Sequence, residues 1–247
     1  MAIEALSLFH WKNEVVLQTT SGSVTIHLRT LGGIEDEQRM DAALAASREA
    51  RAKLEDKKSS LYRNHIAPLI SLSRDELVEV IVMLQRGLFV REAQWKVEPR
   101  GEPEAPEEQL GGDYGIDVIS EPQLEDFLKW QDQKDSLRGE LEERRTKWVD
   151  EQVEALKEEL KELKRAILLD RAIELHKMAI MEKTYNNEWD YWTVYLGSFK
   201  NEDCTKPFFK GVQEVKELPT LIRRQLEAAY LELDIFSRNP EQLKNLS

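Results

Sequence analysis

Residues 149–167 read VDEQVEALKEELKELKRAI and form the centre of a long charged stretch that runs from Ser120 to Lys183. Apolar side chains recur there in alternating steps of four and three, at Val149, Val153, Leu156, Leu160, Leu163 and Ile167. This spacing is typical of a coiled-coil seam, in which one stripe of a helix faces a partner helix. Acidic and basic side chains at i,i+4 offsets are typical of the solvent-exposed surface of a helix, here the surface outside the seam. The sequence predicts one long helix over about residues 120–183.

The start of this helix carries its own signal, because Ser120 can cap it and Pro122 stands near the first helical position. The stretch then contains no further proline and a single glycine, Gly139. An unbroken helix of about 60 residues would be a rod of roughly 90 Å. Such a rod cannot bury its own seam. It either folds back as an intrachain helical hairpin or meets another chain, such as a second copy of itself, and the sequence leaves both alternatives open.

Composition narrows the class of protein. The chain has 247 residues, a net charge of −12, one third charged residues and 41% hydrophobic residues, a balance that favours exposed helices over a thick central sheet. A protein that binds nucleic acid needs a basic surface, so this negatively charged chain is not expected to have a nucleic-acid partner. The single cysteine, Cys204, excludes an intramolecular disulfide and a thiolate zinc site. No signal peptide or membrane span is predicted, which indicates a cytoplasmic protein without a membrane partner.

The sequence of the first 98 residues predicts a domain that contains one β-hairpin and several helices. The hairpin spans about residues 11–31, where Val24, Ile26 and Leu28 alternate with polar residues, and the helix that follows Gly33 is its expected support. Residues 73–76 (SRDE) form a capping box for another helix. That helix is apolar enough to be buried, and it is expected to end around residues 91–95.

Residues 99–115 contain three prolines, four glycines and four glutamates, a composition that predicts a linker. Residues 116–247 then form the second predicted domain. It contains the long helix, an aromatic segment over residues 185–199, and an amphipathic helix over about residues 220–236. The predicted fold class is therefore mainly α (α+β), with an N-terminal β-hairpin with helices and then a helical domain with a long coiled-coil-like helix.

Motifs for catalysis or cofactor binding are absent from the sequence. No phosphate-binding glycine loop and no paired metal-ligand motif occurs on a predicted helix, and the four histidines are scattered. We therefore expect no catalytic, cofactor-binding or metal-binding residues. The remaining enzymatic hypothesis is a metal-dependent hydrolase or nuclease whose carboxylates converge only in three dimensions.

Two features could bind a protein partner. One is the seam of Val149 to Ile167, whose alternative role is an intrachain hairpin. The other is the aromatic segment, where Trp189, Trp192 and Tyr195 are of the residue types that dominate interface hot spots. Core packing against the final helix is the alternative role of these aromatic residues.

The order of elements resembles a known family. A short hairpin leads through RTLGG (residues 29–33) into an alanine- and arginine-rich helix, followed by LSRDELV (residues 72–78) and a closing helix over residues 218–234. This arrangement is similar to tail assembly chaperones of long-tailed bacteriophages. The resemblance implies a non-enzymatic protein that binds a tape-measure-like or tail tube protein. The alternative is a coiled-coil structural or adaptor component of a virion or another assembly.

Overall fold

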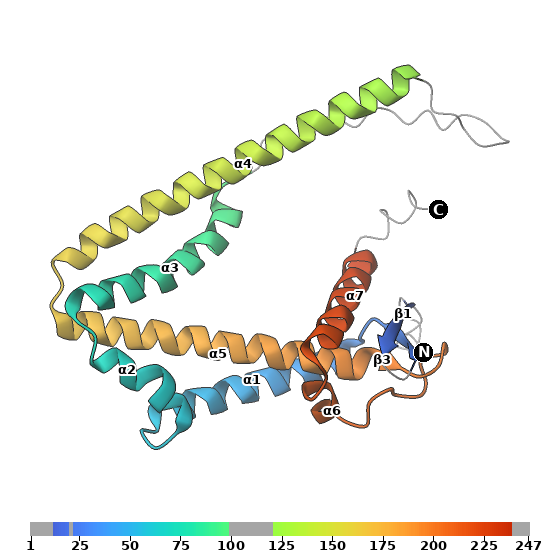
Figure 1. The fold of residues 1–247 in the computed structure, drawn as a ribbon, viewed down its shortest axis with the longest axis horizontal. Coiled ribbons are helices and arrows are strands. Elements are labelled where there is room, and N and C mark those ends of the chain that lie inside the picture. The colour runs from blue at the N-terminus through green and yellow to red at the C-terminus, as the bar shows by residue number, and fades with distance from the viewer. Residues whose placement is uncertain (1–11, 20–21, 99–120, 239–247) are drawn as a thin grey trace, which may run out of the picture. The chain divides into compact units, whose positions relative to one another are not determined.

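The computed structural model describes residues 12–19, 22–98 and 121–238 (Figure 1). The chain is mainly helical with a small antiparallel sheet, which confirms the predicted fold class. It divides into two compact units. Unit 1 comprises residues 1–64 and 177–247, and unit 2 comprises residues 65–176.

These units differ from the domains predicted from composition, which had boundaries at residues 98 and 115. The predicted linker, residues 99–115, lies outside the described residues. The unit boundaries fall instead at a π-helical turn, Tyr62–Ile66, and within helix α5 (Arg165–Gly197). The physical reason is that a change in composition does not reveal which distant segments share a core. Here both ends of the chain contribute to unit 1.

The sheet of unit 1 begins with the predicted hairpin, which the structure confirms. Strands β1 (Lys12–Thr19) and β2 (Gly22–Arg29) pair antiparallel, with Val15 opposite Ile26 and Leu17 opposite Val24. A two-residue strand, β3 (Ser198–Phe199), adds to the other edge of β2. Strand β3 directly follows α5, so the sheet edge fixes where that helix ends.

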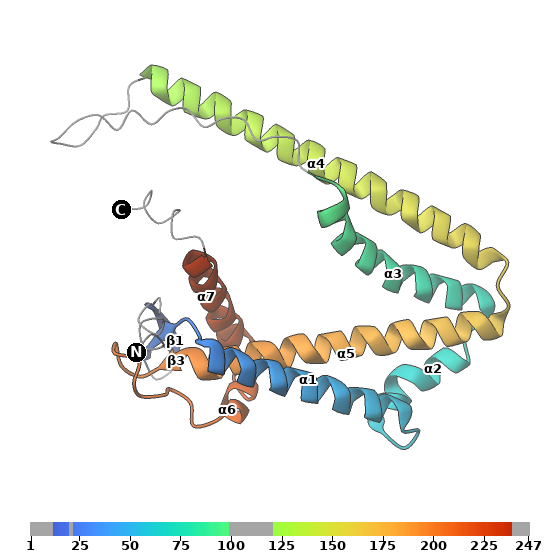
Figure 2. The ribbon, with the colours of Figure 1, turned by 180° about the vertical axis from the view of Figure 1, so that it is seen from behind.

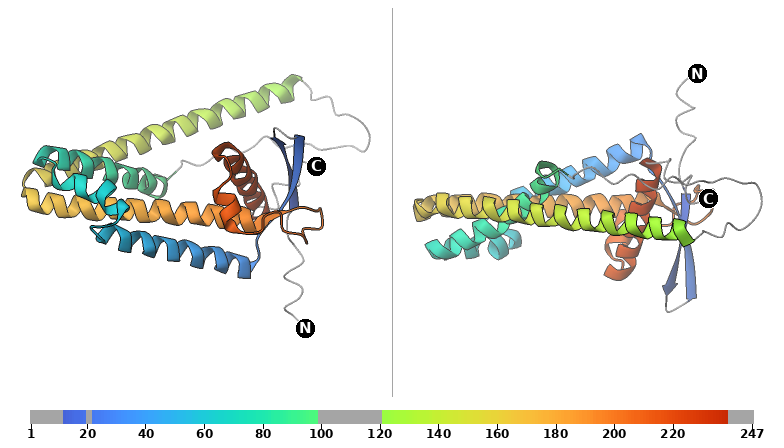
Figure 3. Two further views of the ribbon diagram at one scale, coloured as in Figure 1. Left: turned by 60° about the horizontal axis from the view of Figure 1, so that its bottom comes forward. Right: turned by 90° about the horizontal axis from the view of Figure 1, so that it is seen from above.

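Helices from the C-terminal part of the chain cover the apolar face of the hairpin (Figures 1 and 3). Ile26 and Leu28 are each 1% exposed, and they share a core with apolar residues of α5, α6 (Val212–Lys216) and α7 (Thr220–Arg238): Val194, Val215, Leu226 and Leu233. The expectation that the following helix supports the hairpin is therefore wrong. Amphipathic α7 offers a larger apolar stripe than alanine-rich α1 (Gly33–Glu55).

Unit 2 contains α2 (Ala67–Ile70), α3 (Arg74–Lys96), α4 (Glu121–Lys161) and the first part of α5. The predicted capping box at the start of α3 is confirmed. The Glu76 amide donates to the Ser73 hydroxyl at 3.3 Å, and the Ser73 amide donates to the Glu76 carboxylate at 2.7 Å. Helices α3 and α4 run antiparallel, because Arg86 pairs with Asp150 at 3.2 Å while Arg74 contacts the end of α4.

The prediction of one continuous helix over residues 120–183 is wrong, because the helix is interrupted between Lys161 and Arg165. The reversal places Leu160 of α4 and Leu168 of α5, both 0% exposed, in one cluster with Leu77 and Ile81 of α3. The Arg74 guanidinium donates to the Leu160 carbonyl at 3.2 Å, and it also bonds the carbonyl of Lys161. These bonds satisfy carbonyl groups that the end of a helix leaves without intrahelical donors.

Candidate functional site

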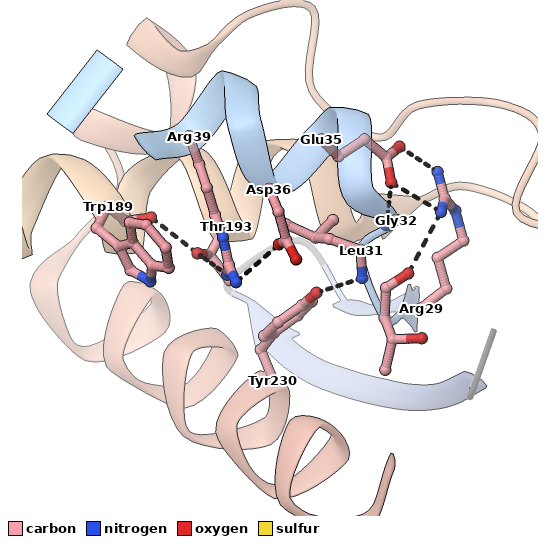
Figure 4. A network of polar contacts seen from close by, with 10 residues as sticks. Arg29, Leu31, Gly32, Glu35, Asp36, Arg39, Trp189, Thr193 and Tyr230 are labelled. Carbon is pink, nitrogen blue, oxygen red and sulfur yellow. Dashed lines mark hydrogen bonds and ion pairs between the residues drawn. The ribbon is translucent and has the colours of Figure 1, made fainter. Parts of the chain in front are cut away.

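A buried arginine organises the polar contacts of unit 1 (Figure 4). The Arg39 side chain is 8% exposed and forms an ion pair with Asp36, one helical turn earlier in α1, at 2.8 Å. Its Nη1 donates to the Thr193 hydroxyl at 3.0 Å, and its guanidinium lies 4.0 Å from the centroid of the Trp189 ring. Buried charges require such partners because removal from water is costly. Arg39 therefore fixes α1 to α5.

The spacing within each helix explains why these groups meet. Trp189 and Thr193 are four residues apart, so they lie on one face of α5. The Thr193 hydroxyl also donates to the Trp189 carbonyl at 2.8 Å, which fixes the hydroxyl orientation that accepts from Arg39. The first turn of α1 is anchored in a similar way. Glu35 forms an ion pair with Arg29 of β2 and accepts from the Gly32 amide at 2.9 Å.

Tyr230 of α7 closes the network from a third helix, as Figure 4 shows. Its hydroxyl accepts a hydrogen bond from the Leu31 amide at 2.8 Å. The ring also lies against Gly197, where an added methyl group would contact ring carbons of Tyr230 and approach the Arg29 carbonyl to 3.3 Å. Gly197 thus permits a close approach of α7 to the end of α5.

A cavity of about 120 Å³ lies beside this network. Its lining residues come from α1, α5 and α7: Arg39, Trp189, Asp190, Thr193, Val194, Glu227, Tyr230 and Leu231. Pockets for drug-sized ligands span roughly 300–1,000 Å³, so this cavity suits only a small group. Burial raises the pKa of the Asp190 carboxyl to about 6, and the negative charge of Glu227 also raises it. The positive charges of Arg223 and Arg39 lower the pKa of this carboxyl and so partly offset the increase.

The cavity brings together a half-buried carboxyl group with a raised pKa and a buried guanidinium, which are the groups that sequence reasoning missed. Asp190 lies inside the predicted aromatic segment, but its sequence neighbours give no sign of the charges from α1 and α7 that surround it. Among the described residues, no group of three or more His, Cys, Asp or Glu side chains could hold a metal ion. Chemically, the arrangement can bind or release a proton near pH 6.

The structure places the predicted seam residues in different environments. Val149, Val153, Leu156 and Leu160 are buried within unit 2, the first two near Ala93 of α3 and the other two near Leu77 and Ile81. Leu163 is half-buried in the turn between α4 and α5. Ile167, by contrast, is 50% exposed at the start of α5. Four of the six residues are therefore buried in their own chain, and Leu163 packs against the same cluster as Leu156 and Leu160.

The predicted aromatic residues lie in unit 1 at the end of α5. The Trp189 ring contacts the Arg39 guanidinium and stacks on the Tyr185 ring, whose centroid is 5.9 Å away. The rings of Trp192 and Tyr195 meet edge to face at 5.6 Å, and Tyr195 packs against the core that α7 shares. All three predicted residues are half-buried, so each offers part of its surface to the chain and part to the outside.

Two helix surfaces of unit 2 remain as candidate protein-binding sites. The first is a stripe on α4, defined here as Trp130, Lys134, Leu137 and Leu141, all four of which are half-buried. The second is a stripe on α3, defined as Val80, Met83, Gly87 and Val90. The prediction that α3 is buried is wrong for this side of the helix, since Met83 is 64% exposed and Val90 is 50% exposed. Helix α3 is apolar around most of its circumference, whereas the described neighbours in unit 2 cover only part of it.

In the described part of the chain, no helix is both long and apolar enough to cross a membrane. Comparisons of the chain with protein-family models, with curated protein sequences and with solved structures found no match.

Proposed function

We propose that this protein is a non-enzymatic binding and assembly protein whose partner is another helical protein. The observation that carries the proposal is the part of α4 that continues beyond α3 (Figures 2 and 3). Arg145 donates to the Gln94 carbonyl near the end of α3, and α4 extends from there back to Glu121. The clusters of described apolar residues reach Trp148 but include no earlier residue of α4.

The α4 stripe has the pattern of a helix that docks on another helix. Its members follow at steps of four, three and four, and through Arg145 they continue the predicted seam toward the N-terminus. Lys134 lies over the Trp130 ring at 4.9 Å, so its aliphatic stem extends the apolar strip. The other sides of the helix are mainly charged, with Leu128 as an exposed apolar residue outside the stripe. An amphipathic helix of this kind binds through one apolar stripe.

In its finer form, the proposal is a tail assembly chaperone that shields a tape-measure-like or tail tube protein. The resemblance in element order supports this form, together with the negative charge that would keep a complex with an apolar partner in solution. The α4 stripe would cover apolar helices of the partner. The alternative is a structural or adaptor protein that uses the same stripe and remains in the finished assembly.

The test is affinity purification of the tagged chain from cells that also express its neighbouring genes. We expect one long, helix-rich protein to be recovered in a fixed ratio to the tagged chain. Substitution of both Leu137 and Leu141 by lysine should abolish recovery, because two charges would be placed in the apolar stripe. Ser136→Lys is the matched control, since it adds a charge to an exposed position of the same helix turn.

Retention of the partner by the Leu137→Lys/Leu141→Lys variant would overturn the assignment of the α4 stripe. Recovery of the tagged chain alone would contradict the chaperone form of the proposal. Analysis of purified assembled particles distinguishes the chaperone from the structural component. A chaperone would be absent from the particles, whereas a structural component would remain in them.

A further inference from the structure

Helix α3 has more apolar surface than unit 2 covers. Residues 78–90 read VEVIVMLQRGLFV. Toward α4 the helix presents Val82, Phe89 and Ala93, and toward the junction of α4 and α5 it presents Leu77 and Ile81. The α3 stripe follows at steps of three, four and three. Met83, Gly87 and Val90 of the stripe are exposed, whereas Val80 is half-buried and also packs against the cluster of Leu77 and Ile81. A helix that is apolar on nearly all sides is normally buried on nearly all sides.

Gly87 marks the centre of the exposed side. A glycine within a helix costs about 1 kcal/mol relative to alanine, so a position that tolerates any side chain has no local reason to retain it. A methyl group added at Gly87 would meet nothing within 4 Å in the chain itself. No packing constraint of unit 2 therefore requires the glycine. Gly87 is exposed, and it adds no side chain to the surface between Met83 and Val90.

The charges of α3 divide along its length. Its first half contains three acidic residues and one basic residue, and its second half contains three basic residues and one acidic residue. The exceptions are Arg74, which bonds carbonyl groups at the end of α4, and Glu92. Arg86 pairs with Asp150 of its own chain, but both side chains remain more than half exposed. A second α3 aligned antiparallel would set the mainly acidic half of each copy against the mainly basic half of the other, with Glu79 of one copy level with Arg91 of the other. The two helix dipoles would also oppose one another favourably.

We propose that the α3 stripe is a self-association surface that pairs antiparallel with α3 of a second copy of this chain. A twofold axis at the level of Gln85 relates the two helices. A residue that precedes Gln85 in one copy then lies opposite the residue that follows Gln85 by the same number of positions in the other copy. Met83 of one copy then faces Gly87 of the other, and Val80 faces Val90. Each methionine packs over the glycine of the other copy, as a knob enters a hole, and the symmetry forms this contact twice. The surface is separate from the α4 stripe, so the pairing does not depend on the proposed partner.

The first test is the mass of the full chain in solution, measured by light scattering during size-exclusion chromatography over a range of concentrations. We expect a dimer, with twice the mass of the 28.8 kDa chain. The Met83→Lys/Val90→Lys variant should weaken dimerisation at least tenfold, because it buries two charges per copy. Trp95→Lys is the matched control. Trp95 is 83% exposed on the same helix but does not belong to the α3 stripe, because a further step of four from Val90 would reach Gln94.

Circular dichroism checks that each variant retains its helical content. A wild-type chain that is monomeric at all concentrations would overturn the proposal, and that result would also be expected if residues 99–120 of the same chain covered the stripe. A dimer that Met83→Lys/Val90→Lys leaves intact would overturn it equally. Trp95→Lys weakening the dimer as much as that variant would show association through exposed apolar groups in general.

Disulfide trapping tests the orientation without relying on a disruptive variant. Met83→Cys and Gly87→Cys chains of different tag length are prepared separately and then mixed under oxidising conditions. The antiparallel pair predicts a disulfide between the two different variants and little within either one. Met83→Cys chains linked to one another would instead indicate a parallel pair and overturn the proposed arrangement. The wild-type chain controls for Cys204, which is buried.

Discussion

The Arg39 guanidinium lies 4.0 Å from the centroid of the Trp189 ring, so a charge from α1 covers the aromatic face of a residue 150 positions later in the chain. The same guanidinium binds Asp36 and Thr193. Unit 1 is thus held by a polar contact between its two chain segments as well as by its apolar core. A cation over a desolvated aromatic ring contributes about 1–2 kcal/mol.

Replacing Arg39 by methionine should reduce the free energy of unfolding by about 2 kcal/mol, because Asp36 loses its partner and the Trp189 ring loses its cation. Asp36 is partly exposed, which limits the cost. Urea unfolding followed by tryptophan fluorescence measures the change. Arg51→Met is the control, since Arg51 forms an exposed ion pair with Glu55 that should contribute less than about 1 kcal/mol. Equal losses in the two variants would contradict a special role for Arg39.

Asp190 should make unit 1 more stable as the pH falls from 7 toward 4. The pKa of its carboxyl is raised to about 6 in the folded protein, against 3.8 as the ordinary value. The folded state therefore binds the proton more tightly than the unfolded state, and the penalty of the charged form is relieved as pH falls through 6. Because the side chain is only half-buried, solvent screening leaves about 1 kcal/mol of this penalty.

Asp190→Asn should therefore be more stable than the wild type at pH 7, and its advantage should disappear near pH 4. Urea midpoints across this range, with exposed Asp41→Asn as the control, measure the difference. His176 of unit 2 acts in the opposite direction, because burial lowers the pKa of its imidazole and its charging destabilises the fold at low pH. His176 is present in both the wild type and the Asp190→Asn variant, so its contribution cancels when their stabilities are subtracted. A difference that does not change with pH would refute the role of Asp190.

Gly197→Ala should destabilise unit 1 by about 2 kcal/mol, since the added methyl group would displace the Tyr230 ring or the strand that begins at Ser198. Thermal unfolding reports the loss. Hydrogen exchange at the Leu31 amide should accelerate as well, because the displaced Tyr230 hydroxyl no longer accepts its hydrogen bond. Gly139→Ala is the control, for nothing lies within 4 Å of the added group, and it should stabilise α4 by about 0.5–1 kcal/mol.

Two truncations to alanine within the predicted seam should differ sharply in cost. Leu160→Ala should lower the free energy of unfolding by about 3 kcal/mol, because Leu160 is 0% exposed between α3 and α5. Ile167→Ala should cost less than about 1 kcal/mol, since half of that side chain is already exposed to solvent. Chemical denaturation of both variants tests the difference. Similar losses would contradict the difference in burial between Leu160 and Ile167.

Local patterns predict much of the secondary structure. The alternation of Val24, Ile26 and Leu28 predicts the hairpin, and the capping box of Ser73 and Glu76 predicts the first turn of α3. These signals act over a few residues, so no tertiary contact is needed to interpret them. The charged runs likewise predict exposed helices, which the structure confirms in α4.

Interactions between segments far apart in the sequence decide the remainder. No proline or glycine interrupts residues 161–165, yet the chain reverses there because Leu160 and Leu168 are buried together against α3 and Arg74 binds the last carbonyls of α4. Spacing alone assigns Val149 and Ile167 to the same seam, although only Val149 is buried. The cavity at Asp190 depends on Arg39 and Glu227 from two other helices. Helix type and amphipathic pattern follow from short-range geometry along the sequence. Which apolar faces are covered depends on contacts between distant segments, so it follows from the tertiary structure.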